Sequence, residues 1–434
     1  MENGDPLQEK RSEDLEQGRS PNSTQNSIPR PAKGQAAPNG GLRAWSVVLG
    51  ATMSQMCTFG YIQSFGVYQQ YYQRNFLSSE TPSNISWIGS LQVCLLFLSG
   101  LLSGPLFDRY GARAVLIPAS ITMVFSVMMT SLCRKMYEFI LAQGILGGFA
   151  CGMIFTPVVS AAGQYFTTRR ALAMGLVTSG ASIGGVIWPI VLNRLLNFST
   201  IGFGWTVRIV GFIMLPLLAT TCALVIEWAP RRKGRDILLP AAWKNVPYVF
   251  ANIGFFTTLL GLYTPIFYLV TYSVAHGMSL NMAFYEVSIY NAGSFLGRTT
   301  AGTLADRFGR FNMMILTDLA SAILIFCWIA ATSNAGITVF AVFFGIMSGA
   351  VVSLYSPCVA ECATSPSDIG TYLGMGMGFC SLAGLTGTPM NGAMIRNFGT
   401  YWQASVFSGL MVIVGTCSNV VSRLWLNKKI FAKA

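Results

Sequence analysis

The sequence predicts an all-α integral membrane protein, with twelve transmembrane helices in two six-helix halves and both termini in the cytoplasm. Three observations predict this fold class: the composition, the recurrence of long apolar runs, and a motif that occurs once in each half. Of the 434 residues, 53% are hydrophobic and only 10% are charged. Soluble domains carry about 25% charged residues, so the composition excludes a soluble fold.

Apolar runs of about 20 residues recur along the chain, and each is long enough to cross roughly 30 Å of hydrocarbon as a helix. A membrane β-barrel would instead need short segments of alternating polarity, which the sequence does not contain. The twelve expected spans are 44–70, 85–107, 114–132, 138–159, 171–193, 205–228, 246–272, 283–303, 312–331, 335–357, 370–392 and 402–424.

The segments outside the spans divide the chain into parts. The first 43 residues are rich in Pro, Ser, Asn, Gln and charge, and they lack the apolar core of a signal peptide, so we expect them to be disordered. A basic stretch in the middle separates six spans from six. The expected parts are a disordered cytoplasmic tail 1–43, an N-terminal half 44–228, a cytoplasmic linker 229–245, a C-terminal half 246–424 and a short cytoplasmic tail 425–434.

Positive charge predicts the orientation. With both termini inside, the cytoplasmic segments hold 21 of the 28 Lys and Arg residues, in agreement with the positive-inside rule. The Lys and Arg residues that give the net charge of +12 therefore lie beside the spans and do not form a patch on one face. The lipid bilayer, and not nucleic acid, is the expected partner. The plasma membrane is the expected location, with the vacuolar or another internal membrane as the alternative, and a monomer is expected to suffice.

Residues for catalytic or metal chemistry are scarce. The chain has a single histidine, His276, and its ten cysteines fall almost entirely within the spans. We therefore expect no enzyme activity, no catalytic residue, no metal site and no cofactor. The phosphate-binding loop of a primary pump does not occur either. Two sequons on the expected outer side, at Asn84 and Asn197, are candidates for glycosylation.

One motif occurs in both halves. GPLFDRYGAR at 104–113 and GTLADRFGRF at 302–311 share Gly, Leu, Asp, Arg and Gly in register. The first glycine lets two helices approach closely, and the aspartate can cap the next helix or pair with a basic residue on a neighbour. Such a contact would latch one conformation; the alternative is a tight turn with topology-setting arginines. The expected gating residues are Gly104, Asp108, Arg109, Gly111 and Arg113 in the first copy and Gly302, Asp306, Arg307, Gly309 and Arg310 in the second.

Two homologous halves with a site between them are a transporter architecture. The doubled motif resembles the signature G-x-L-x-D-R-x-G-R of the major facilitator superfamily, and the resemblance covers residues 40–430. Within that superfamily the chain is most similar to the monocarboxylate-porter group, particularly its fungal branch. The segments that carry this likeness are NGGLRAW (39–45), YFTTRRALAMGLVTSGASIGG (165–185) and YTPIFYLVTY (263–272).

Arg298 is a positive charge inside the expected eighth span, where a charge is a functional candidate and normally needs a partner. The resemblance implies that Arg298 matches a substrate arginine of the animal porters. Their aspartate four residues earlier is Ser294 here, and their first-span lysine is Gln63. A proton–lactate symport of that form is therefore not expected, although another acid could couple transport to protons. Three roles are open for Arg298. It could bind a substrate anion, it could pair with Asp318 (with Glu361 as the second choice), or it could extend toward the inner interface.

Spans 1, 4, 7 and 10 line the central cavity in this superfamily, which adds polar and aromatic candidates. For a single aromatic residue, packing at a helix interface is the commoner role. Few charges among many aromatic residues indicate an amphipathic, partly aromatic organic solute. The substrate-binding candidates are Arg298, Asn291, Gln63, Tyr61, Tyr263, Tyr268, Asn252 and Tyr355, with Gln55, Gln143, Phe155 and Ser353 as further lining residues.

The sequence thus predicts a secondary active transporter that moves a small organic, anionic or amphipathic metabolite by alternating access. Loss of the aspartate and the lysine favours efflux of a secondary metabolite. The alternative is uptake of a monocarboxylate or another small nutrient. A transporter-like receptor is a remote alternative, because the tails offer little room for a signalling module.

Overall fold

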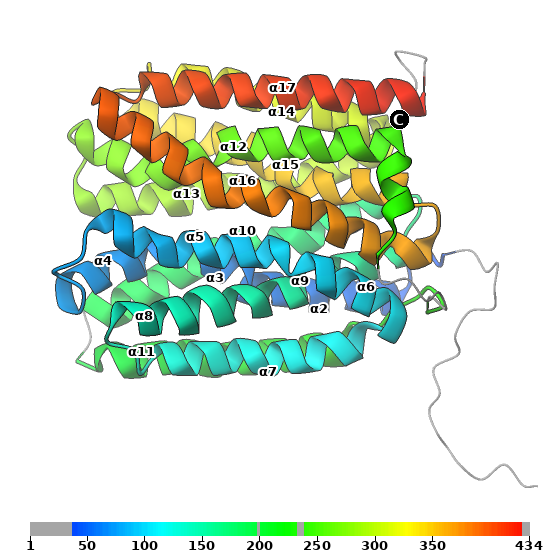
Figure 1. Ribbon diagram of the computed structural model, residues 1–434, viewed down its shortest axis with the longest axis horizontal. Coiled ribbons are helices and arrows are strands. Elements are labelled where there is room, and N and C mark those ends of the chain that lie inside the picture. Colours follow the sequence, from blue (N-terminus) through cyan, green and yellow to red (C-terminus); the bar gives the residue numbers. More distant parts are fainter. Residues whose placement is uncertain (1–36, 198–199, 232–237, 428–434) are drawn as a thin grey trace, which may run out of the picture.

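The computed structural model describes residues 37–197, 200–231 and 238–427, which form helices and turns and contain no strand (Figure 1). The expected all-α membrane fold is confirmed, and the helices match the twelve expected spans. Among the described residues, nine helices are long and apolar enough to cross a membrane. The expected tail and linker lie partly outside the described residues, at 1–36, 232–237 and 428–434.

Three spans of the first half are not single α-helices. The first span is broken at Thr58 and again at Gln63 and Ser64, the second is broken at Ser99, and the fourth contains a π-helix. The helices of this half are α2 (Leu42–Cys57), α3 (Phe59–Ile62), α4 (Phe65–Asn75), α5 (Pro82–Leu98), α6 (Gly100–Tyr110), α7 (Ala112–Thr130), α8 (Met136–Phe139), η1 (Ile140–Gly147), α9 (Gly148–Tyr165), α10 (Arg170–Asn197) and α11 (Gly202–Leu224).

The second half consists of longer, unbroken helices. Ser279 marks the start of α13, because its side chain accepts a hydrogen bond from the backbone N–H of Met282. Two short 3₁₀ helices, η2 (Pro240–Lys244) and η3 (Pro366–Asp368), lie in the connections. The six long helices are α12 (Val246–Ala275), α13 (Leu280–Phe308), α14 (Arg310–Trp328), α15 (Asn334–Cys362), α16 (Ile369–Phe398) and α17 (Trp402–Leu426).

The helices lie side by side along one axis, with α12–α17 on one side of the bundle and α2–α11 on the other (Figure 1). The two groups meet mainly where α10 packs on α13 and where α5 and α6 pack on α16. Neither α13 nor α16 belongs to the nine most apolar helices.

Candidate functional site

The α10–α13 pair joins the two halves through polar contacts along its length. The two helices are antiparallel: Ala171 lies beside Asp306 at one end, and Pro189 and Ser288 line one cavity near the other. Since the Asp306 end belongs to the predicted cytoplasmic motif, the cavity lies toward the outer side. This pair therefore connects the predicted gating motif to an outer cavity.

Asp306 closes the cytoplasmic end of the pair. Its two carboxylate oxygens accept hydrogen bonds from the backbone N–H groups of Ala171 (2.9 Å) and Leu172 (2.8 Å), in the first turn of α10. A carboxylate at this position satisfies N–H groups that have no partner within the helix and also complements the positive end of the helix dipole. Asp306 therefore holds a helix of the opposite half.

Asp108 makes the same contact in the other direction. Its carboxylate accepts hydrogen bonds from the backbone N–H groups of Gly370 (3.2 Å) and Thr371 (2.6 Å) and from the Thr371 hydroxyl (2.7 Å), at the start of α16. The sequence suggested a cap on the next helix or a basic partner. In the structure each aspartate instead caps a helix in the other half, and Asp306 also has the expected basic partner, Arg310 on α14 at 3.8 Å.

The glycines of the doubled motif have two distinct structural roles. Gly111 (φ 88°) and Gly309 (φ 104°) turn the chain in a region that favours glycine. Gly104 instead lies against the backbone of Gly370, where a Cβ atom would overlap the carbonyl oxygen. Gly302 is similar, since its Cβ would lie 2.7 Å from the carbonyl oxygen of Ala171. The predicted close helix approach occurs across the halves.

The arginines of the motif differ in what they contact. Arg310 donates to the carbonyl oxygen of Thr167 (3.0 Å) and forms ion pairs with Glu361 and Asp306, so it also joins the halves. The remaining three stay within their own half: Arg109 lies over the Tyr110 ring, Arg307 over the Phe308 ring, and Arg113 donates to the Ala223 carbonyl oxygen.

Arg298 is buried in the middle of the α10–α13 pair, with 4% of its surface exposed. Its Nη1 donates to the carbonyl oxygen of Thr178 on α10 (2.7 Å), and its Nε donates to the Ser294 hydroxyl (3.2 Å). The side chains of Tyr290 and Tyr263 lie near it. Arg298 therefore bridges the halves through a neutral backbone carbonyl.

The two carboxylates expected as partners of Arg298 lie elsewhere. Asp318 accepts a hydrogen bond from the Asn419 amide (2.8 Å), and Glu361 pairs with Arg310. Within the described residues, no carboxylate oxygen lies within 4 Å of the Arg298 guanidinium. The expectation of a permanent ion pair is therefore wrong in this conformation, because Arg298 donates to the Thr178 carbonyl oxygen and not to a carboxylate.

Small polar side chains continue the contact on the outer side of Arg298. Ser182 donates to Ser294 across the pair (3.1 Å), and the Asn291 amide donates to the carbonyl oxygens of Gly185 (3.4 Å) and Val287 (2.9 Å). The Asn291 Oδ1 atom is buried and has no hydrogen-bond partner among the described residues. A substrate donor would satisfy that oxygen.

The other predicted candidates do not gather in one place. Tyr263 lies near Arg298, whereas the Tyr355 hydroxyl donates to Asn252 Oδ1 (2.7 Å) within the C-terminal half. The Tyr61 hydroxyl donates to the Tyr68 hydroxyl (2.9 Å) within the N-terminal half. The Tyr268 hydroxyl lies against Gly392 of α16. Of the eight candidates, Arg298 and Tyr263 lie near each other, and Asn291 lies about two turns from Arg298 on the same helix.

The further lining residues also have local roles. Gln143 accepts from the Tyr72 hydroxyl (2.7 Å), and Ser353 donates to the Ala350 carbonyl oxygen (2.9 Å). Phe155 lies near Phe59, with ring centres 6.4 Å apart. Both polar atoms of the Gln55 side chain are buried without a hydrogen-bond partner in the described part of the chain.

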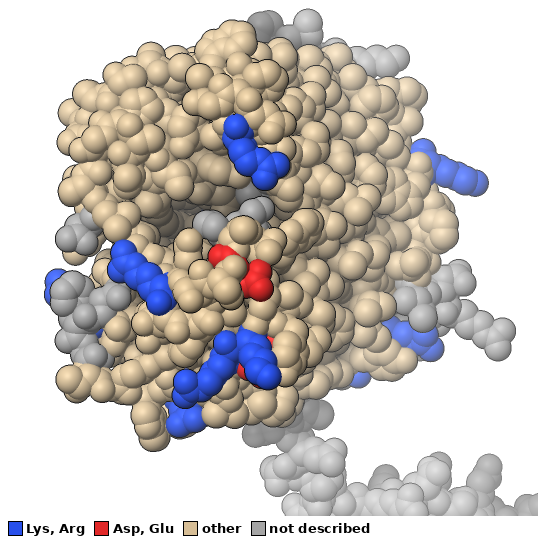
Figure 2. Space-filling model, turned by 60° about the vertical axis from the view of Figure 1, so that its left-hand side comes forward, with Lys and Arg blue, Asp and Glu red and all other residues tan. Residues whose placement is uncertain are grey.

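An outer cavity of about 290 Å³ lies between the halves. Figure 2 shows this end of the molecule, with a hollow between its two parts. Gln63, whose amide also donates to the Ala181 carbonyl oxygen (3.2 Å), is the predicted candidate that reaches the cavity. The cavity is lined by Gln63, Gly66, Val67, Pro189, Ile190, Asn193, Arg194, Val270, Phe284, Tyr285, Val287 and Ser288.

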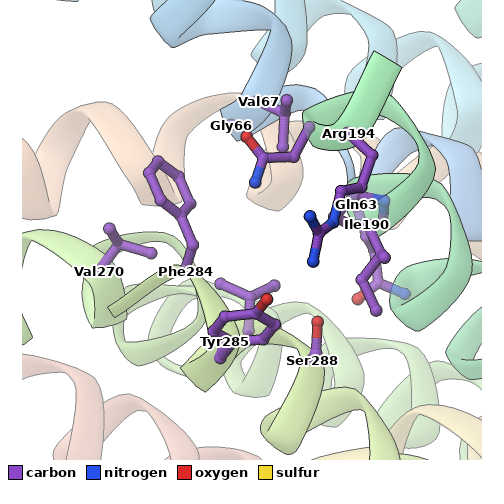
Figure 3. Close-up of a pocket in the computed structure, with 12 residues that line it drawn as sticks. Gln63, Gly66, Val67, Ile190, Arg194, Val270, Phe284, Tyr285 and Ser288 are labelled. Atoms are coloured by element: carbon purple, nitrogen blue, oxygen red, sulfur yellow. The ribbon is translucent and has the colours of Figure 1, made fainter. Parts of the chain in front are cut away.

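Arg194 is a lining residue that falls just beyond the expected fifth span, 171–193. The fifth span was expected to end at 193, but α10 continues to Asn197, so Arg194 lies in the last turn of that helix. Figure 3 shows its guanidinium extending into the cavity, toward the hydroxyl groups of Tyr285 and Ser288. The sequence signal that was missed is a cation next to Asn193, at the end of a long apolar helix.

Of the two glycosylation candidates, the structure describes the side chain of Asn84 but not that of Asn197. Asn84 is exposed in the first turn of α5, where its side chain donates to Glu80 (2.9 Å). The sequon at Asn197 continues into 198–199, and the Asn197 side chain lies outside the described residues with them. Modification of either residue stays a prediction.

Comparison with known proteins agrees with this geometry. The sequence profile described as "Major Facilitator Superfamily" matches residues 44–388. The aspyridones efflux protein apdF of Emericella nidulans is 46% identical over 387 residues, which cover 89% of this chain and 79% of that protein. The agnestins efflux protein AgnL12 of Paecilomyces divaricatus is 41% identical over 395 residues, 90% of each chain.

A solved structure shares the fold at low sequence identity. The proton:xylose symporter XylE superposes with a TM-score of 0.68 at 15% identity, covering 89% of this chain and 96% of that one. This likeness concerns the fold alone. Together, the doubled motif, the twelve-helix fold, the profile match and the fungal relatives show that the chain belongs to the Major Facilitator Superfamily.

Proposed function

We propose that the protein is a secondary-metabolite efflux carrier that works by alternating access. The observation that carries this proposal is the asymmetry of the space between the halves. The cytoplasmic end is held by Asp108 and Asp306, each bonded to a helix of the opposite half, while the outer end contains a cavity. This is the arrangement of a carrier in its outward-facing state.

The contacts suggest how the cycle proceeds. Opening toward the cytoplasm requires that both helix starts, at Ala171 and Thr371, lose their carboxylate caps. When the halves separate at this end, water can hydrogen-bond to the freed N–H groups and carboxylates, which offsets part of the loss. The two caps therefore stabilise the outward-facing state without making it permanent.

Arg298 supports an anionic or amphipathic substrate. It is the cation buried at the interface between the halves, its neighbours are hydroxyl groups and a backbone carbonyl, and no described carboxylate neutralises it. A substrate acid would provide the counter-charge that the protein lacks there. The two relatives named as efflux proteins for aspyridones and agnestins support export as the direction.

The same proposal covers the source of the negative charge, the coupling to protons and the location of the carrier. The chain resembles the monocarboxylate-porter group, but Ser294 and Gln63 replace the charged residues of a proton–lactate symporter. We therefore infer that the substrate itself, and not a protein carboxylate beside Arg298, supplies the negative charge. Any proton coupling would run through a more distant acid. The proposal places the carrier in the plasma membrane, where a monomer suffices for transport.

Comparative metabolite profiling tests the proposal. Medium and cytosol of cells that lack or overproduce the protein are compared by mass spectrometry. Export predicts that one or more organic acids fall in the medium and rise in the cytosol when the protein is absent. The opposite change would show uptake of a nutrient, and an unchanged profile would contradict a transport function under those conditions.

A further inference from the structure

We propose that the outer cavity binds the acidic group of the exported molecule, with Arg194 as its cation. This inference rests on the proposed function and adds to it a second anion site, distinct from Arg298 and nearer the outer mouth. It assigns the substrate class as an organic acid, such as a carboxylic acid, an enolic acid or an acidic phenol, attached to an apolar body.

The charge of the cavity lining selects for an anion. Among its twelve lining residues Arg194 is the one charged side chain, and none of them is Asp or Glu. Arg194 is exposed at the mouth of this cavity, where it attracts an anion from the surrounding water, more weakly as the salt concentration rises. A cationic substrate would instead be repelled by the guanidinium at this point.

The geometry of the cavity fits a forked contact. The Arg194 guanidinium extends from α10 into the space, and the hydroxyl groups of Tyr285 and Ser288 on α13 point toward the same space (Figure 3). A guanidinium presents two parallel N–H donors to a carboxylate, and neighbouring hydroxyls add further donors. The donors therefore come from both halves of the protein.

The rest of the lining fits an apolar body. Val67, Ile190, Val270 and Phe284 supply aliphatic and aromatic surface on four different spans. A volume of about 290 Å³ lies near the lower limit for small-molecule pockets, which suits a molecule of one or two rings. The cavity thus combines one cation with mostly apolar walls.

The position of Arg194 relates it to Arg298. Arg298 contacts α10 at Thr178, and Arg194 lies about 24 Å further along the same helix, from the rise per residue of an α-helix. Two cations therefore lie at different depths along one helix pair. A substrate anion released by Arg298 would meet Arg194 before it reached the outer medium, so we assign Arg194 to an exit site.

Cysteine modification tests the anion preference without knowledge of the substrate. Ser288→Cys is introduced into a protein in which the exposed Cys327 and Cys417 are replaced by serine. The rates of modification by an anionic sulfonatoethyl and a cationic trimethylammonioethyl methanethiosulfonate are then measured. The ratio of the two rates, anionic over cationic, reports the potential in the cavity.

Arg194→Gln should lower this ratio by about fivefold or more, because the one full charge in the lining of the cavity that holds the thiol is lost. Arg74→Gln is the matched control, since Arg74 is an exposed arginine at the outer end of α4 and does not line the cavity. An unchanged ratio in Arg194→Gln, an equal fall in both variants, or an introduced thiol that neither reagent modifies would overturn the proposal.

A second readout separates this site from the proposed function. In cells, Arg194→Gln should reduce the exported organic acids in the medium at least about threefold, and Arg194→Lys should restore part of the loss, because lysine keeps the charge without the fork. If deletion of the protein changes no exported metabolite while the rate ratio still depends on Arg194, the proposed function is wrong and the anion site stands. If export occurs but the ratio does not depend on Arg194, the site is wrong.

Discussion

The two helix pairs that join the halves have the same geometry but differ in the side chains buried between the helices. Both are antiparallel, and in both an aspartate of the doubled motif caps the partner helix. The α6–α16 pair is then packed through glycine: a Cβ on Gly100 would lie 3.2 Å from the Gly374 carbonyl oxygen. The α10–α13 pair also has close glycine contacts, at Gly175 and Gly302, but in addition it contains the buried Arg298 and its hydrogen bond to Thr178.

This difference shows how a repeated scaffold can hold one specific site. By the register of the repeat, Gly100 is the position that corresponds to Arg298. An arginine at Gly100 would find the backbone of α16 in its way, with Met377 and Thr156 as further close neighbours. We infer that the α6–α16 pair is the mechanical contact of the carrier and that the α10–α13 pair, the polar pair, carries substrate recognition. The predictions below test this division.

The largest effect is expected for Arg298→Ala. Loss of the guanidinium removes the charge from the polar pair and leaves the Thr178 carbonyl oxygen without its donor. Hydrogen bonds to charged groups contribute about 1.5–3 kcal/mol, so export of an acidic substrate should fall about tenfold to hundredfold. Initial export rates in cells, with surface expression measured in parallel, check this. Normal export in a well-expressed variant would refute a substrate role for Arg298.

Gly374→Ala should break the other pair. The added Cβ would overlap the Gly100 carbonyl oxygen, so α6 and α16 have to separate. Transport should fall about tenfold for acidic and neutral substrates alike, because packing and not recognition is disturbed. Gly387→Ala on the same helix is the control, since its Cβ would meet nothing closer than 3.4 Å. Equal activity of the two variants would contradict the mechanical role.

Removal of the carboxylate caps should shift the balance between the outward-facing and inward-facing states. Asp108→Ala and Asp306→Ala each lose a helix cap, which is worth about 1–2 kcal/mol. The outward-facing state should lose population by about fivefold to thirtyfold, so turnover slows more than substrate affinity falls. Export rates at several substrate concentrations separate the two effects. A loss of affinity at normal turnover would argue against a latch.

Ser182→Ala is expected to have the smallest effect. It removes the Ser182–Ser294 hydrogen bond across the polar pair and leaves the Arg298–Thr178 contact in place. A neutral hydrogen bond contributes about 1 kcal/mol, so export should change by about fivefold at most. A loss as large as that of Arg298→Ala, at equal expression, would mean that the whole polar pair acts as one unit and that the arginine has no separate role.

The sequence was sufficient for the fold because long apolar runs and a motif repeated in register are local signals. It did not identify the partners of Asp108 and Asp306, because those contacts join segments more than 130 residues apart in the chain. Arg298 shows the same limit: a carboxylate partner was the reasonable expectation, but a backbone carbonyl on another helix leaves no trace in the sequence.

Arg194 was missed for a different reason. The expected span ends at 193, but α10 continues to Asn197, and this difference of a few residues places Arg194 on the helix and not in a loop. Helix ends are the least certain feature of a sequence pattern. Tyr61 and Tyr355 show the converse. Both are polar aromatic residues on expected cavity-lining spans, but each hydroxyl is bonded within its own half.

The distance between the cytoplasmic ends of the halves tests the central claim most directly. Spin labels at Ala114 of α7 and Leu316 of α14, both exposed, report that distance by pulsed electron resonance in a protein without exposed cysteines. In the unaltered protein a short distance should predominate. In the Asp108→Ala, Asp306→Ala double variant a longer distance should gain population. An unchanged distribution in the double variant would contradict the claim that these two caps hold the cytoplasmic side closed.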